Sequence, residues 1–138
     1  MKARELTRHL AGLRQLREHR AETAMARCAR EKQTVGRLKE KEQKAAEGVR
    51  AADNHRRHLL KEFDSRYRDQ GTNIQELLAW RQEEASLMGA LEKARTRHEQ
   101  SREELEQARN ALNQARAESQ AAYRRKQKVE WLSAELNQ

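Results

Sequence analysis

Two interleaved series of residues, each repeating at every seventh position, run through the second half of the chain. They start at Trp80 and Leu77, and the distance from one series to the other alternates between three and four residues. This alternation is typical of the seam of a coiled coil. The first series is Trp80, Leu87, Ala94, Ser101, Ala108, Ala115, Ala122, Val129 and Leu136, and its companion is Leu77, Glu84, Leu91, His98, Leu105, Leu112, Ser119, Lys126 and Ser133. A seven-residue period of this length requires a partner helix along the same stripe, so we expect a rod that contacts other proteins and carries out no chemistry.

The first half of the chain has a seam of its own that is less regular. Its two series are Cys28, Val35, Glu42, Val49, Arg56 and Phe63, and Ala24, Glu31, Leu38, Ala45, Ala52 and Leu59. Upstream, one broad helical face carries Leu6, Leu10, Leu13 and Leu16. This face is out of phase with the later seam, which predicts a stutter in the heptad pattern between Arg17 and Ala24.

The best break in the helical pattern lies at residues 69–73, almost at the midpoint of the chain. Gly71 can adopt the left-handed conformation that ends a helix. Thr72 or Asn73 can then cap the next helix, with Gln75 and Glu76 as capping-box partners. Three further glycines interrupt helical pattern without turn residues around them, and we interpret them as tolerated weak points or close helix contacts: Gly36, Gly48 and Gly89.

These patterns predict an all-α fold, a long two-helix antiparallel coiled coil (αα-hairpin), as a single domain over residues 1–138. We expect helix one at about 3–69, the turn at about 70–73 and helix two at about 74–136. Facing residues should have numbers that sum to roughly 142. A continuous helix that dimerises, or a domain-swapped dimer, stays open as an alternative.

The composition argues against a globular enzyme. Of the 138 residues 38% are charged and only 4% are aromatic, which is too little bulk for a globular core. There is no phosphate-binding loop or nucleophile motif, so we expect no catalytic residues, no cofactor and no small-molecule substrate. His55 and His58 could share a metal, but a solvated helix face explains them better, and we expect no metal site. No secretory signal or apolar membrane span is evident, and the single Cys28 fits a cytoplasmic location.

Folding the chain at its midpoint brings its two basic ends together. The net charge of +8 lies entirely in residues 1–69, and a second basic cluster lies near the C-terminus. We define the terminal tip as Arg4, Leu6, Arg8, Leu10, Leu13, Arg124, Arg125, Lys128, Trp131 and Leu132. The central end consists of Phe63, Tyr67, Ile74, Leu77, Leu78, Trp80 and Arg81. There we expect Phe63 and Trp80 to pack against each other, and Tyr67 and Leu78 to be exposed.

A basic tip can bind nucleic acid, anionic lipid or an acidic protein surface, or it can be an ordinary charged end of a coiled coil. The leucines beside the charges favour a protein partner. Nucleic acid is the weaker candidate because the first twenty residues contain no aromatic side chain on which a base could stack.

Four stretches of the chain resemble one known family. Residues 75–82 (QELLAWRQ) followed by Leu87 are similar to the middle of the central-stalk proteins of type III secretion (YscO/FliJ type). Residues 13–24 (LRQLREHRAETA) resemble the opening of the injectisome branch, which we favour. Residues 91–94 (LEKA) with His98, and 125–131 (RKQKVEW), are similar to the flagellar branch.

This resemblance implies a role in protein transport and, for the injectisome branch, in virulence. Members are small cytoplasmic antiparallel coiled coils, peripheral to the secretion apparatus at the inner membrane and not inserted in it. They occupy the pore of the hexameric secretion ATPase, promote its assembly and activity, contact the cytoplasmic domain of the export gate and bind secretion chaperones. The resemblance therefore implies that the terminal tip enters the ATPase pore and that the central end faces the export gate. A generic coiled-coil adaptor or chaperone without an ATPase partner is the alternative, and a nucleic-acid-binding helical hairpin is the third.

Overall fold

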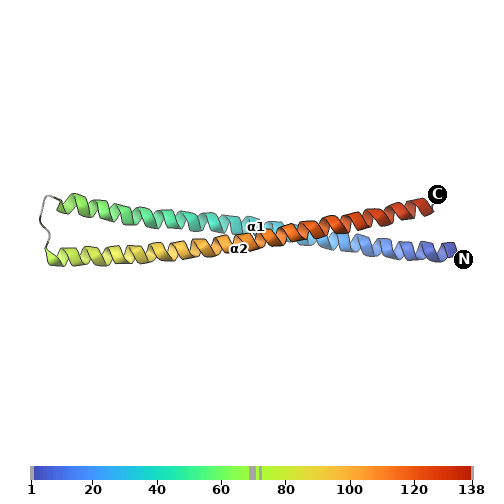
Figure 1. Cartoon of the computed structure of the whole chain (residues 1–138), viewed down its shortest axis with the longest axis horizontal. Coiled ribbons are helices and arrows are strands. Elements are labelled where there is room, and N and C mark those ends of the chain that lie inside the picture. The colour runs from blue at the N-terminus through green and yellow to red at the C-terminus, as the bar shows by residue number, and fades with distance from the viewer. Residues whose placement is uncertain (1, 69–70, 72, 138) are drawn as a thin grey trace. The chain divides into compact units, whose positions relative to one another are not determined.

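The computed structural model describes residues 2–68, 71 and 73–137. They form two helices, α1 (Lys2–Tyr67) and α2 (Ile74–Leu136), and no strand occurs in these ranges (Figure 1). The two helices pack against each other in opposite directions, which confirms the predicted all-α antiparallel hairpin. The expected second helix, about 74–136, begins and ends at these residues, whereas α1 ends two residues before the expected position 69.

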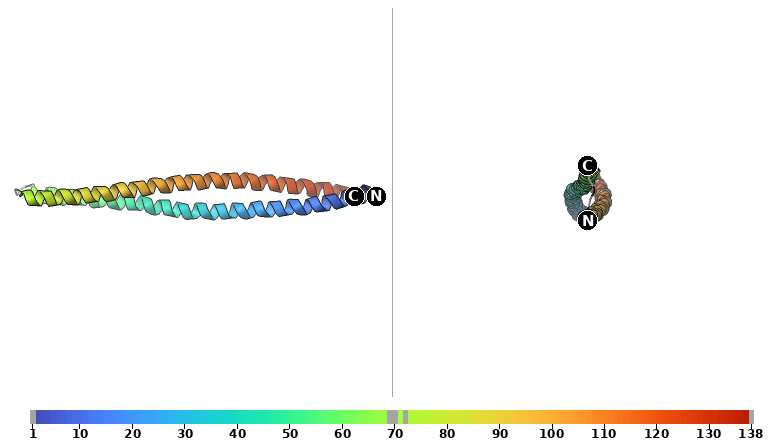
Figure 2. Two further views of the ribbon diagram at one scale, coloured as in Figure 1. Left: turned by 90° about the horizontal axis from the view of Figure 1, so that it is seen from below. Right: turned by 90° about the vertical axis from the view of Figure 1, so that its left-hand side faces the viewer.

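The chain divides into two compact units. The terminal unit consists of Met1–Arg37 and Glu106–Gln138, and the central unit consists of Leu38–Leu105. Within each unit a segment of α1 lies beside a segment of α2, as two perpendicular views show (Figure 1 and Figure 2). Both ends of the chain belong to the terminal unit. That residues 1–138 act as a single domain stays a prediction.

The predicted seams are the places where side chains are buried. All members of the two series in α2 are buried or half-buried except Leu136, which is 49% exposed near the end of the helix. The members of the α1 series from Ala24 to Phe63 are likewise buried or half-buried. The buried residues are Ala21, Leu59, Leu91, Ser101, Leu105, Ala108, Leu112, Ala115 and Val129. The seven-residue period therefore locates the interface correctly in both helices.

The burial pattern near the N-terminus agrees with the predicted stutter between Arg17 and Ala24. Ala21 is buried and Arg17 is half-buried, and these residues lie seven positions before Cys28 and Ala24. Upstream of Arg17 the phase changes, because Leu13 is half-buried whereas Arg14, which an unbroken heptad pattern would place on the seam, is exposed. Leu6 and Leu16 are exposed.

Polar pairs across the seam define the register of each unit. In the central unit His98 Nε2 and Glu42 Oε1, both on predicted seam positions, are 2.8 Å apart, and Lys41 Nζ lies 3.1 Å from Glu104 Oε2. In the terminal unit Arg27 forms an ion pair with Glu118. The residue numbers of each pair sum to near the expected value of roughly 142. The sequence therefore predicted the pairing of the helices as well as their existence.

The end of α1 differs from the prediction. The helix ends at Tyr67, and the N–H of Arg68 donates a last hydrogen bond of 3.1 Å to the carbonyl of Asp64. The helix thus ends four residues before Gly71, so the expected helix end at Gly71 is wrong. The expected turn at 70–73 lies partly outside the described residues, which omit 69, 70 and 72.

The start of α2 is capped by Asn73. Its side-chain Oδ1 accepts a hydrogen bond of 2.7 Å from the N–H of Glu76, and its carbonyl accepts one of 3.1 Å from the N–H of Leu77. These bonds satisfy groups at the helix start that have no partner within the helix. Asn73 is therefore the cap, while the other candidate, Thr72, lies outside the described residues.

The glycines inside the helices are not close contacts. A Cβ atom added at Gly36, Gly48 or Gly89 would meet no other heavy atom within 4 Å. Of the two interpretations left open by the sequence, that of a tolerated weak point therefore holds.

Replacing Gly48 with alanine should raise the free energy of unfolding by about 0.5–1 kcal/mol, because alanine loses less backbone entropy in a helix. Chemical denaturation measures this gain, and a loss would show that the site is crowded.

The buried alanines of α2 set how closely the helices approach. Ala115 is 1% exposed, whereas Ala117, two residues later, is exposed. Ala115→Leu should overpack the interface and lower the free energy of unfolding by about 1–3 kcal/mol. The matched change Ala117→Leu should be nearly neutral. Equal melting temperatures for the two variants would contradict the register described above.

Candidate protein-binding surfaces

The terminal unit brings the residues of the terminal tip into one place, since they come from the two ends of the chain. Its charged members are all exposed: Arg4, Arg8, Arg124, Arg125 and Lys128. Trp131 is 60% exposed, and Leu6 and Leu132 are exposed too. Leu10 and Leu13 are only half-buried. The unit therefore presents cations and large apolar side chains together on its surface.

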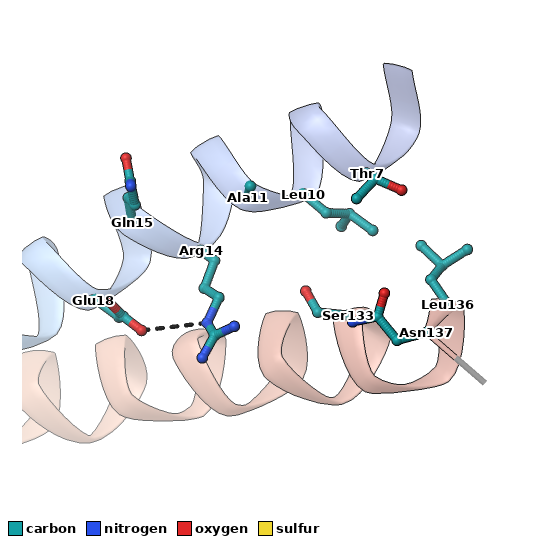
Figure 3. Close-up of a pocket in the computed structure, with 9 residues that line it drawn as sticks. All are labelled: Thr7, Leu10, Ala11, Arg14, Gln15, Glu18, Ser133, Leu136 and Asn137. Carbon is teal, nitrogen blue, oxygen red and sulfur yellow. Dashed lines mark ion pairs between the residues drawn. The ribbon is translucent and has the colours of Figure 1, made fainter. Parts of the chain in front are cut away.

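A cavity of about 350 Å³ separates the helices at this end. Leu10 from α1 and Leu136 from α2 point into it from opposite sides (Figure 3). Arg14 also lines the cavity, and its Nε lies 3.4 Å from Glu18 Oε1 on the same helix. The apolar side chains here are thus less tightly packed than those of the buried seam.

The cavity has a cause in the sequence. This region carries Arg14 and Arg17 in α1, and Lys126 and Ser133 in α2. None of these four side chains can fill a helix interface as leucine does, and the three cations keep their charged ends in water. The terminal part of the seam is consequently weak, which leaves its leucines accessible.

The central end is organised by three aromatic rings. Phe63 and Trp80 pack edge to face with centroids 5.3 Å apart, and Tyr67 lies 5.1 Å from Phe63. The indole Nε1 of Trp80 donates a hydrogen bond of 3.3 Å to the hydroxyl of Tyr67. The contact between Phe63 and Trp80 is as expected. The expected exposure of Tyr67 is wrong, because its ring is half-buried in this cluster.

Beside these rings lies a set of exposed residues. Ile74 is 77% exposed, and Leu78 is exposed as predicted. Arg81 is exposed and Leu77 is half-buried. Leu60, which the sequence analysis did not select, is also exposed and lines a cavity of about 180 Å³ with Phe63 and Trp80. Leu60 directly follows the seam residue Leu59, and this adjacency was the only signal that could have identified it.

The remaining candidate groups offer little chemistry. His58 Nε2 lies 3.0 Å from Glu62 Oε1 on its own helix. Within the described ranges, no group of three or more His, Cys, Asp or Glu could hold a metal ion. The free Cys28 is half-buried on the seam, where a thiol packs as a small apolar group. No helix in the described part of the chain has a segment apolar and long enough for a membrane span.

Filling the weak end of the seam should stabilise the hairpin. Arg14→Leu with Ser133→Leu should close the cavity and raise the free energy of unfolding by about 1–3 kcal/mol, as expected for apolar side chains moved out of water. The control replaces two exposed residues away from the seam, His19→Leu with Gln127→Leu, and should give no gain. Thermal unfolding compares the two, and equal melting temperatures would show that the polar residues do not cause the gap.

Comparison with known proteins identified no relative of this chain. The chain matches no family model, no curated protein and no solved structure. Its function therefore has to be argued from its own residues.

Proposed function

We propose that this protein is the central stalk of a type III secretion ATPase complex. In this proposal the terminal tip enters the pore of the hexameric ATPase and promotes its assembly and activity. The central end contacts the cytoplasmic domain of the export gate, and secretion chaperones bind to the same protein. The chain acts in the cytoplasm, peripheral to the secretion apparatus, and carries no active site of its own.

One observation carries the proposal: the terminal unit unites both ends of the chain. The basic cluster near the N-terminus and that near the C-terminus are more than a hundred residues apart in sequence. Their arginines become one exposed cationic surface only through the antiparallel fold. A slender tip with cations and exposed leucines suits insertion into a partly acidic protein pore, where charge steers the encounter and apolar contacts hold the complex.

The central end supports the second half of the proposal. Its aromatic rings pack against each other and so fix the ends of both helices, while Ile74 and Leu78 stay exposed. Large exposed apolar side chains on a rigid support are typical of protein-binding sites. Arg81 adds a cation beside them. This surface is chemically different from the terminal tip, as two different partners would require.

The terminal tip should stimulate the ATPase through its charges. Reversing Arg4, Arg8, Arg124 and Arg125 to glutamate should abolish stimulation of ATP hydrolysis, because the four exposed cations would become anions facing the pore. Stimulation by the unaltered protein should fall steeply with salt, since screening acts over about 10 Å at 0.1 M ionic strength. Hydrolysis by the purified ATPase, with helix content checked by circular dichroism, measures both effects.

A control variant carries the same change of charge in the central unit, at the exposed residues Lys44, Arg50, Lys61 and Lys93. It should keep full stimulation. Leu6→Ala with Leu10→Ala should weaken stimulation with little added salt dependence. If the four reversals at the tip leave stimulation intact, the pore model is wrong. Tight binding to DNA or RNA with no effect on the ATPase would favour the nucleic-acid alternative.

A further inference from the structure

The two edges of the seam in the terminal unit differ in charge. In an antiparallel pair of helices, equivalent flanking positions of the two heptads face each other along each edge of the seam. On one edge these positions hold Arg27 and Glu118, and the structure joins them in a cross-helix ion pair. This pair is electrostatically complementary, and it shows the register of the helices in this unit.

The opposite edge has no such complementarity in its middle part. Its flanking positions there hold Met25 and Lys32 from α1, and Arg109, Arg116 and Tyr123 from α2, and we call these five residues the basic edge. Beyond them the same edge holds Glu18 and Glu130, and each of these forms an ion pair within its own helix. The register set by Arg27 and Glu118 places Lys32 at a level between Arg109 and Arg116. It likewise places Met25 between Arg116 and Tyr123. Cations from the two helices therefore follow one another along a single edge, next to two large side chains.

All five residues of the basic edge are exposed to solvent. Met25 is 59% exposed and Tyr123 is 50% exposed. In the described part of the chain, neither Lys32 nor the two arginines form an ion pair within 4.0 Å. Glu106 lies three residues before Arg109 on α2, but no ion pair joins them. The like charges of the two helices thus repel each other in the free protein, and an anionic partner would relieve that repulsion.

We propose that the basic edge docks an acidic amphipathic helix of another protein, laid along the terminal unit as a third helix. Arg109, Arg116 and Tyr123 are spaced by seven residues. At 1.5 Å per residue, this places them about 10 Å apart, which is the repeat of a partner helix with one carboxylate per heptad. Each arginine offers a fork of donors that fits a carboxylate.

The two large side chains argue for a protein partner. Met25 and Tyr123 offer an adaptable thioether and an aromatic ring with a polar end, both common anchors for the apolar face of a helix. A phosphate backbone would use the cations but would leave Met25 exposed to water. None of the five residues belongs to the terminal tip, so this docking site stands apart from the proposed binding of the ATPase and does not depend on it.

A designed peptide tests the proposal directly. The probe is a fluorescent helix of about four heptads with leucine and glutamate repeating at three- and four-residue spacing. Fluorescence anisotropy should show that the full-length protein binds it, and that the triple variant Lys32→Glu, Arg109→Glu and Arg116→Glu binds at least about tenfold more weakly. The matched control reverses Arg30, Arg37 and Lys44, which are also exposed and seven residues apart, and should bind normally.

Three results would overturn the proposal. The first is equal affinity of the triple variant and the unaltered protein for the peptide. The second is tighter binding to a DNA duplex or to anionic vesicles than to the peptide, lost in the same triple variant. The third is self-association of the protein that the triple variant abolishes, seen by sedimentation equilibrium, which would make a second copy the occupant of the edge.

A stability measurement separates loss of binding from loss of fold. Lys32→Glu alone should raise the melting temperature by about 1–2 °C, because it replaces a repulsion with Arg109 and Arg116 by an attraction. The same variant should bind the acidic peptide more weakly. Met25→Ser with Tyr123→Ser should weaken peptide binding without changing its salt dependence. A lower melting temperature for Lys32→Glu would show that the edge is not arranged as described.

Discussion

The close packing of two helices along a seven-residue stripe is the interaction on which the rest of this structure depends. Few side chains are large, and the buried set consists mainly of leucines and alanines. Each alanine buries little apolar area, so the stability of the hairpin has to come from many small layers. Because most layers use the same phase, a shift of one residue would move charged side chains onto the interface. Phase thus constrains the sequence along most of its length, and Arg17 is half-buried on the seam.

Polar residues on the seam make this weak interface specific. The pair of His98 and Glu42 joins two seam positions, so it is formed only when the helices have the correct register. Ser101 is buried and donates a hydrogen bond of 2.9 Å to the carbonyl of Arg97, so it needs no partner across the seam. Arg56 is different, because its buried Nε has no hydrogen-bond partner in the described part of the chain. Such a group lowers stability. The seam therefore combines layers that define the register with layers that lower the stability of the helix interface.

The sequence predicted the fold better than it predicted the surfaces. A seven-residue period constrains every position of a long helix, so Leu91 and Ala115 could be assigned to the interface without any structure. The cap at Asn73 was also predictable, because its chemistry is local. The change of phase near the N-terminus was predictable too, since half-buried Leu13 and exposed Arg14 agree with the stutter. The error at the central end has another cause. The exposure of Tyr67 was misjudged because its position depends on Trp80 in the other helix. The basic edge could not be recognised before the register was known, since Lys32 and Arg116 are far apart in sequence.

The distribution of weak points along the seam connects this fold with binding. The buried residues of the terminal unit end at Ala21 and Val129, and beyond them the seam carries cations and a cavity. A stronger end was available to this sequence, since Leu6 and Leu16 are exposed instead of buried between the helices. Their placement keeps apolar side chains on the surface next to exposed arginines. The basic edge follows the same principle, because a single acidic residue at position 32 would replace repulsion by an ion pair. At both places the chain keeps groups that destabilise the isolated hairpin. Contact of these groups with another protein can instead stabilise the complex.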